Sequence, residues 1–143
     1  MLELHFILIL AILTYTDVKE KRIPNGLLLL AVVVKILFFL MKNGVDWMGM
    51  ALIFLDGLIV SLPVWILVIL MDQLLKKQTM GGGDIKLLFV TGMYLGWEQN
   101  LWMLLVAGVL ALLYAIIVRK KELAFGPAIA VATIVLFLRN IIK

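Results

Sequence analysis

Six apolar stretches, separated by short polar segments, organise the whole chain. An α-helix that crosses a bilayer needs about 20 mainly apolar residues, and most of the stretches approach that length, the first and fourth being short. The stretches cover residues 2–18, 25–42, 47–71, 84–97, 100–118 and 123–141. This pattern predicts an all-α, polytopic membrane protein of about six transmembrane helices, folded as a single membrane-embedded domain over residues 1–143.

Proline and glycine mark the expected breaks between and within these helices. Pro24 disfavours helix at Ile23, and Asn25 is expected to cap the second helix. Pro63 lies inside the third stretch and predicts a kink or a break there. The run Gly81-Gly82-Gly83 precedes the fourth stretch, and we expect it to form a loop at the membrane edge, with Gly83 at positive φ or in close contact with the backbone of a ligand.

Composition and charge support a membrane protein. The chain is 65% hydrophobic with a mean hydropathy of +1.18, whereas soluble domains are roughly 45–50% apolar. The net charge is +4, but the basic residues lie between apolar stretches, which indicates membrane orientation rather than nucleic-acid binding. The chain opens Met1-Leu2-Glu3 without a basic residue, so we expect a retained first helix rather than a cleaved signal peptide.

The distribution of basic residues predicts the orientation. The segments after the first, third and fifth stretches carry most of them: Lys19, Lys21, Arg22, Lys76, Lys77, Arg119, Lys120 and Lys121. The opposite side carries Lys42, Arg139 and Lys143. The richer side is expected to be cytoplasmic. Both termini then lie outside, and Asp17 and Asp84 lie at the same, cytoplasmic leaflet.

Asp17 and Asp84 are the candidate catalytic groups. Two carboxylates that share one proton can divide the work of an aspartyl protease, one acting as base towards water and the other as acid towards the peptide carbonyl. Each aspartate alone could instead be an interfacial charge or a helix cap, an alternative that is weaker for Asp84 because it follows three glycines. Their common depth and their flanking residues favour a catalytic pair.

The chain offers little other catalytic chemistry. Cys is absent, and His5 is the one histidine. A thiol nucleophile is therefore excluded, and we expect neither a metal site nor a cofactor. His5 is interpreted as an interfacial residue. The segment Gly81-Gly82-Gly83-Asp84 lacks the Gly-Lys-Ser/Thr ending of a phosphate-binding loop.

Two motifs in order resemble the type IV prepilin peptidase family. They are Asp17 followed by Ile23-Pro24-Asn25, and Gly81-Gly82-Gly83-Asp84-Ile85-Lys86. Phe125-Gly126-Pro127-Ala128 is similar to the last-helix segment of that family. The second motif is the Gly-x-Gly-Asp element of membrane aspartyl proteases.

The resemblance implies an endopeptidase that cleaves the short basic leader of prepilins or pseudopilins at the cytoplasmic membrane face, typically after a Gly, in a prokaryotic inner membrane. It implies that Asp17 and Asp84 are catalytic, and it matches Gly81, Gly83 and Lys86 to further motif positions, with Pro24 and Asn25 as motif support. Longer family members carry an additional region with paired Cys-x-x-Cys motifs, which accompanies N-methylation. This chain shows no such region, so we expect a peptidase-only form.

Charged residues also occur inside the apolar stretches. Lys35 and Asp56 both fall roughly 14–15 Å deep in their helices, at about 1.5 Å per residue, which is near the middle of the bilayer core. They are predicted to form a buried ion pair between neighbouring helices; the alternative is that Lys35 snorkels and Asp56 is protonated or faces a wet crevice. Ala107 and Gly108 are expected to allow close helix packing.

Two other functions remain open from the sequence. A small transporter could use Asp17, Asp56 and Asp84 as a proton or cation path, although no inverted halves stand out. An inactive peptidase-like protein could serve as a scaffold in pilus assembly. The expected partners are a prepilin or pseudopilin substrate and membrane lipids.

Overall fold

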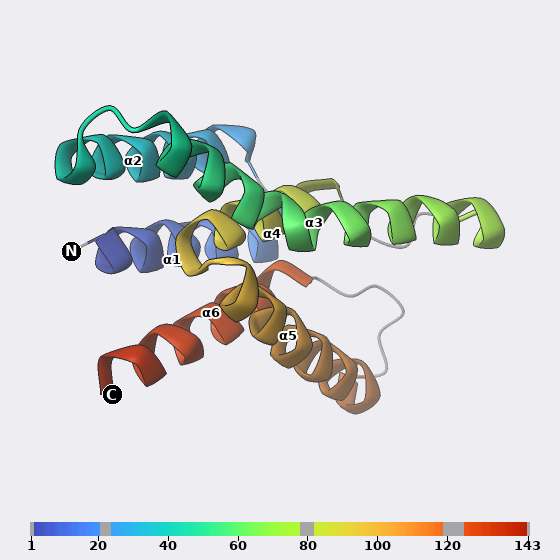
Figure 1. The fold of residues 1–143 in the computed structure, drawn as a ribbon. Coiled ribbons are helices and arrows are strands. Elements are labelled where there is room, and N and C mark those ends of the chain that lie inside the picture. Colours follow the sequence, from blue (N-terminus) through green and yellow to red (C-terminus); the bar gives the residue numbers. More distant parts are fainter. Residues whose placement is uncertain (1, 21–23, 78–81, 119–124, 143) are drawn as a thin grey trace.

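A computed structural model describes residues 2–20, 24–77, 82–118 and 125–142 (Figure 1). These residues form six helices and no strand, so the predicted all-α fold is confirmed. The helices are α1 (Leu2–Glu20), α2 (Asn25–Asn43), α3 (Trp47–Leu75), α4 (Gly82–Leu95), α5 (Trp97–Val118) and α6 (Phe125–Ile142).

The lengths of the helices support a membrane protein but differ from one another. Within the described residues, three helices are long and apolar enough to cross a bilayer, namely α2, α3 and the Trp97–Ile117 part of α5. The apolar parts of α1 and α6 are shorter, Leu4–Asp17 and Ala128–Asn140. Helix α4 has 14 residues and is therefore about 21 Å long, less than the roughly 30 Å of the bilayer core.

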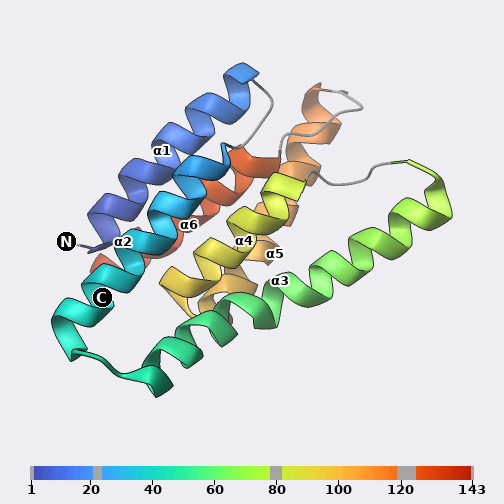
Figure 2. The same cartoon turned by 90° about the horizontal axis from the view of Figure 1, so that it is seen from above.

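The helix ends gather at two opposite ends of the bundle. The two views show both termini at one end, whereas α1 ends and α2, α4 and α6 begin at the other (Figures 1 and 2). Asp17 lies in the last turns of α1, Asn25 is the first residue of α2, and Asp84 lies in the first turn of α4. The topology therefore brings three of the predicted site residues to one end of the molecule.

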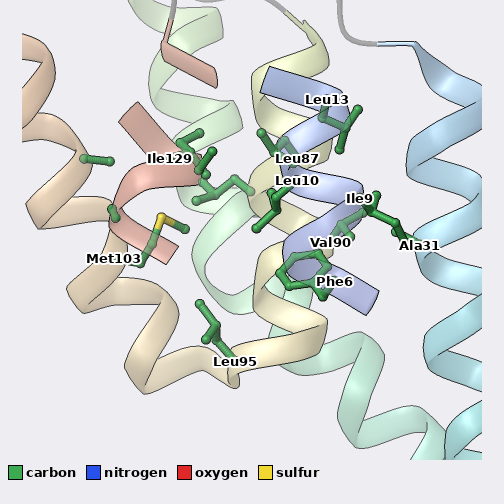
Figure 3. Packing of buried hydrophobic residues seen from close by; sticks show 14 of the residues in the cluster. Phe6, Ile9, Leu10, Leu13, Ala31, Leu87, Val90, Leu95, Met103 and Ile129 are labelled. Atoms are coloured by element: carbon green, nitrogen blue, oxygen red, sulfur yellow. The ribbon is translucent and has the colours of Figure 1, made fainter. Parts of the chain in front are cut away.

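Helix α4 is the centre of the bundle. It packs against α2, α3, α5 and α6, and half of its residues are buried: Leu87, Leu88, Val90, Thr91, Gly92, Met93 and Leu95. Figure 3 shows Leu10 and Phe6 of α1 beside Leu87 and Val90 of α4, with Ile129 of α6 close by. Because lipid is as apolar as these side chains, their contribution to stability comes from close packing.

A buried polar network fixes α4 to α5. The side chain of Asn100 is fully buried and donates from Nδ2 to the carbonyl of Leu88 at 3.1 Å. Its Oδ1 accepts from the hydroxyl of Thr91 at 2.9 Å. Gly96, at φ +84°, is the single residue between the two helices. Because glycine tolerates this backbone conformation, α5 begins at Trp97 rather than at the predicted residue 100.

Glycine also sets the contact between α3 and α4. A Cβ on Gly92 would lie 2.8 Å from the Cα of Gly57 and 2.9 Å from the carbonyl oxygen of Asp56. The two backbones therefore meet at this pair. The predicted role of Gly108 in close packing is wrong, because a Cβ there would have no atom within 4 Å, whereas its neighbour Ala107 is fully buried.

Tyr94 ties α4 to two further helices. Its ring stacks on Phe6 of α1 with centroids 3.8 Å apart, and its hydroxyl donates to the carbonyl of Ala31 in α2 at 2.7 Å. Buried Tyr rings commonly combine apolar packing with such a bond. Tyr94 thus holds α1, α2 and α4 in a fixed relation.

Two predictions about local structure are wrong, and a third is wrong in part. Gly82 and Gly83 belong to the first turn of α4 rather than to a loop, and the described positive-φ glycines are Gly44 and Gly96, so Gly83 does not need positive φ. The break predicted at Pro63 does not occur, because helix α3 runs past that residue; the alternative, a kink, stays a prediction. Asn25 is the first residue of α2 and does not cap it; extended Pro24 holds the cap position.

Candidate functional site

Asp17 is a buried carboxyl in an apolar helix. Only 8% of the residue is exposed. Within the described part of the chain, its Oδ2 atom has no hydrogen-bond partner. The nearby hydroxyls of α1 do not serve it, since Thr14 donates to the carbonyl of Leu10 and Thr16 to the carbonyls of its own helix. A buried polar atom without a partner costs about 1–3 kcal/mol, so its presence requires an explanation, and a catalytic role is one.

Asp84 enters the same region from a different helix. It lies in the first turn of α4, where an acidic side chain is favoured by the unpaired backbone N–H groups of the helix start. It is partly buried, and Asp17 is close enough for the charge on one carboxyl to act on the other. The fold thus brings together the two aspartates that the sequence singles out.

The motif residues around the aspartates also meet. The ammonium of Lys86 donates to the side-chain oxygen of Asn25 at 3.2 Å. This bond joins the segment after Asp84 to the start of α2, directly after Pro24. Gly83 lies in α4 just before Asp84. Gly81 and Ile23, both named in the sequence motifs, lie outside the described residues.

Lys35 and Asp56 lie close enough to interact electrostatically, but the described structure shows no salt bridge between them. The ammonium of Lys35 lies over the ring of Tyr94, 5.3 Å from its centroid. Asp56 acts on Lys35 as a neighbouring opposite charge. Helix α4 packs against both α2 and α3, the helices that carry these two residues. The ion pair remains a prediction.

The chemistry available at this end of the bundle is that of carboxylates. Among the described residues, no group of three or more His, Cys, Asp or Glu side chains could hold a metal ion. Two neighbouring carboxyls can share a proton and act together as acid and base. The sequence analysis did not single out Tyr94 and Asn100, which position the helices behind the site. A single tyrosine or asparagine in an apolar stretch indicates only that its polar group needs a hydrogen-bond partner, and it does not identify that partner.

The fold and the site define a class of protein: a helical membrane protein in which two helices each bring an aspartate to the same end of the bundle. The family model for the type IV leader peptidase family matches residues 4–116. This match covers well over half of the chain, and the chain therefore belongs to that family.

Several curated relatives are prepilin leader peptidase/N-methyltransferases. Those from Pectobacterium carotovorum subsp. carotovorum, Neisseria gonorrhoeae and Aeromonas salmonicida (strain A449) are 31%, 28% and 30% identical, over 85%, 90% and 87% of this chain. The chain spans 45%, 45% and 44% of the length of these relatives. No solved structure is similar enough to count as a match.

Proposed function

We propose that this protein is a membrane aspartyl endopeptidase that removes the leader of prepilins or pseudopilins at the cytoplasmic face of a prokaryotic inner membrane. The proposal rests chiefly on one observation: buried Asp17, with an oxygen that lacks a described partner, lies within electrostatic reach of Asp84 on another helix. Family membership and the relatives' names, which specify prepilin leaders, support the peptidase activity and the substrate.

The two carboxyls divide the reaction between them. One, ionised, takes a proton from a water molecule as the water attacks the carbonyl carbon of the scissile peptide bond. The other, protonated, donates to the carbonyl oxygen, which gives a tetrahedral gem-diol. The first carboxyl then gives its proton to the peptide nitrogen as the C–N bond breaks, and the second takes back a proton from the gem-diol as the new carboxyl group forms. In this role the unpartnered Oδ2 of Asp17 is left for the water or the substrate to bind. Neither step calls for a metal ion or a cofactor.

Incubation with prepilins tests this function. The purified protein, in lipid nanodiscs and in buffer containing EDTA, is mixed with each candidate prepilin from the same genome. Mass spectrometry should show at least one of them shortened by its basic leader, with a single new N-terminus. Failure to cut every prepilin, or cutting that stops with EDTA and resumes with a divalent ion, would contradict the proposal.

The proposed orientation makes a separate prediction. Because the chain has no Cys, a single introduced Cys reports its own side of the membrane. Val45, between α2 and α3, and Lys76, after α3, are both exposed. In intact cells, a membrane-impermeant maleimide should label Val45→Cys but not Lys76→Cys. The reverse pattern would place the aspartates on the outer face.

Lys86 and Asn25 should support activity together, through the hydrogen bond between them. One hydrogen bond contributes about 0.5–1.5 kcal/mol, so Lys86→Met or Asn25→Ala should each lower kcat/KM for prepilin by about two- to tenfold. The double variant should be no slower than the worse single variant. Lys42→Met, at the far end of α2, is the control and should retain full activity. Losses that multiply would show that the two residues act separately.

A further inference from the structure

An apolar groove of about 440 Å³ runs between α2, α3 and α4 beside the candidate site. Buried residues from each of the three helices form its floor, namely Leu28, Ser61 and Val90. Leu29 and Trp65 stand at its rim, and they are 66% and 52% exposed. The groove is therefore closed behind by packed helices and open at the side, towards the lipid.

One end of the groove adjoins the aspartates. Ile85, which follows Asp84 directly, lines the groove together with Lys86 and Asn25. These two polar residues are the hydrogen-bonded pair that joins α4 to α2. A chain that leaves the groove at this end therefore passes next to the candidate catalytic carboxyls.

The course of α3 opens the groove sideways. The buried residues of this helix are Gly57, Val60 and Ser61, all before Pro63. The second half of α3 extends away from the other helices, and both views show this (Figures 1 and 2). Large apolar side chains of that half, such as Leu62 and Trp65, are thus left beside the opening, about half exposed.

The lining suits a helix better than a lipid chain. Helices approach one another closely in membranes where one side offers a small residue. Ser61 is such a residue on the floor, and its hydroxyl already donates to the carbonyl of Gly57 at 2.6 Å, so it requires nothing from an occupant. At the polar end, the ammonium of Lys86 has three N–H donors, and its bond to Asn25 uses one of them. The others suit the peptide carbonyls of a helix that ends there.

We propose that this groove holds the apolar membrane segment of the substrate that follows the scissile bond, and so sets the register in which the peptide meets Asp17 and Asp84. This inference rests on the proposed function. If the basic leader lies in the cytoplasm and cleavage occurs at the membrane edge, the substrate chain beyond the scissile bond enters the bilayer. A groove that begins at the aspartates and runs into the membrane lies on that path.

Narrowing the groove tests the proposal. Val32→Trp fills it from α2, and Val109→Trp makes the same change on an exposed face of α5, outside the groove. Two substrates are compared: a full-length prepilin that the wild type cleaves, and a soluble peptide that ends shortly after its scissile bond. Val32→Trp should reduce kcat/KM for the full-length prepilin by about ten- to a hundredfold, through misplacement of the bond, and leave the peptide unaffected. Val109→Trp should change neither.

A photo-crosslinking side chain provides a second, independent test of what occupies the groove. It is placed at position 62 or at position 109 of the Asp84→Asn variant, which should bind prepilin without cutting it. The proposal expects crosslinks to the apolar segment of the prepilin from position 62 but not from 109. Equal effects of Val32→Trp on both substrates, or crosslinks from position 62 to lipid alone, would overturn the groove assignment while leaving the peptidase in place. A wild type that cleaves no prepilin would remove the proposed function as well.

Discussion

Asp17→Asn and Asp84→Asn should each reduce prepilin cleavage on the order of 10⁴-fold or more, with the protein still folded and inserted. Losses of this size follow when one member of a catalytic unit is removed from a protease. Asparagine keeps the size of the side chain but can neither accept a proton from water nor donate one as an acid. The cleavage rate of each variant, beside its melting temperature in detergent, measures the effect.

Asp46→Asn is the matched control for this prediction. Asp46 is exposed, and its carboxylate accepts from the backbone N–H of Met48 at 3.2 Å as the cap of α3. Asparagine caps helices about as well as aspartate, so cleavage and stability should both be retained. Substantial activity in either Asp17→Asn or Asp84→Asn would remove that residue from the catalytic site and would revive the scaffold or transporter alternatives.

Gly92→Ala should destabilise the fold by about 1–3 kcal/mol, the usual cost of overpacking. The added methyl would lie 2.8 Å from the Cα of Gly57 and 2.9 Å from the carbonyl oxygen of Asp56. Backbone atoms cannot move aside as a side chain can, so α3 and α4 must separate. Detergent melting or unfolding in SDS measures the loss.

Gly108→Ala makes the same chemical change in an open position. A Cβ on Gly108 would have no heavy atom within 4 Å, and alanine in a helix is favoured over glycine by about 0.5–1 kcal/mol. This variant should be neutral or slightly more stable. Equal destabilisation by the two substitutions would contradict the close contact of Gly57 with Gly92.

The sequence predicted the helices well because each apolar stretch must form its backbone hydrogen bonds within itself in lipid. It predicted the local ends less well. The conformational freedom of Gly82 and Gly83 favoured a loop, whereas both residues belong to the start of α4. Pro63 was expected to break or kink α3; the break is absent, since the helix continues past this residue, and the kink stays a prediction.

The two motifs of the candidate site could be predicted from the sequence, but the arrangement of their residues in space could not. Counting basic residues placed Asp17 and Asp84 at one depth, and the fold brings them into electrostatic reach. The bond between Lys86 and Asn25 and the insertion of α4 between its neighbours are long-range features, which no spacing in the sequence specifies. The same applies to Lys35, whose neighbour Tyr94 belongs to that inserted helix.

The most direct test of the catalytic pair is the single-turnover rate constant of leader cleavage in Asp17→Asn, Asp84→Asn and the variant that carries both. If the aspartates work as one unit, the first substitution removes the whole mechanism and the second has nothing left to remove. The double variant should then be as slow as each single variant, within about threefold. A double variant slower by the product of the two single losses would contradict a shared site.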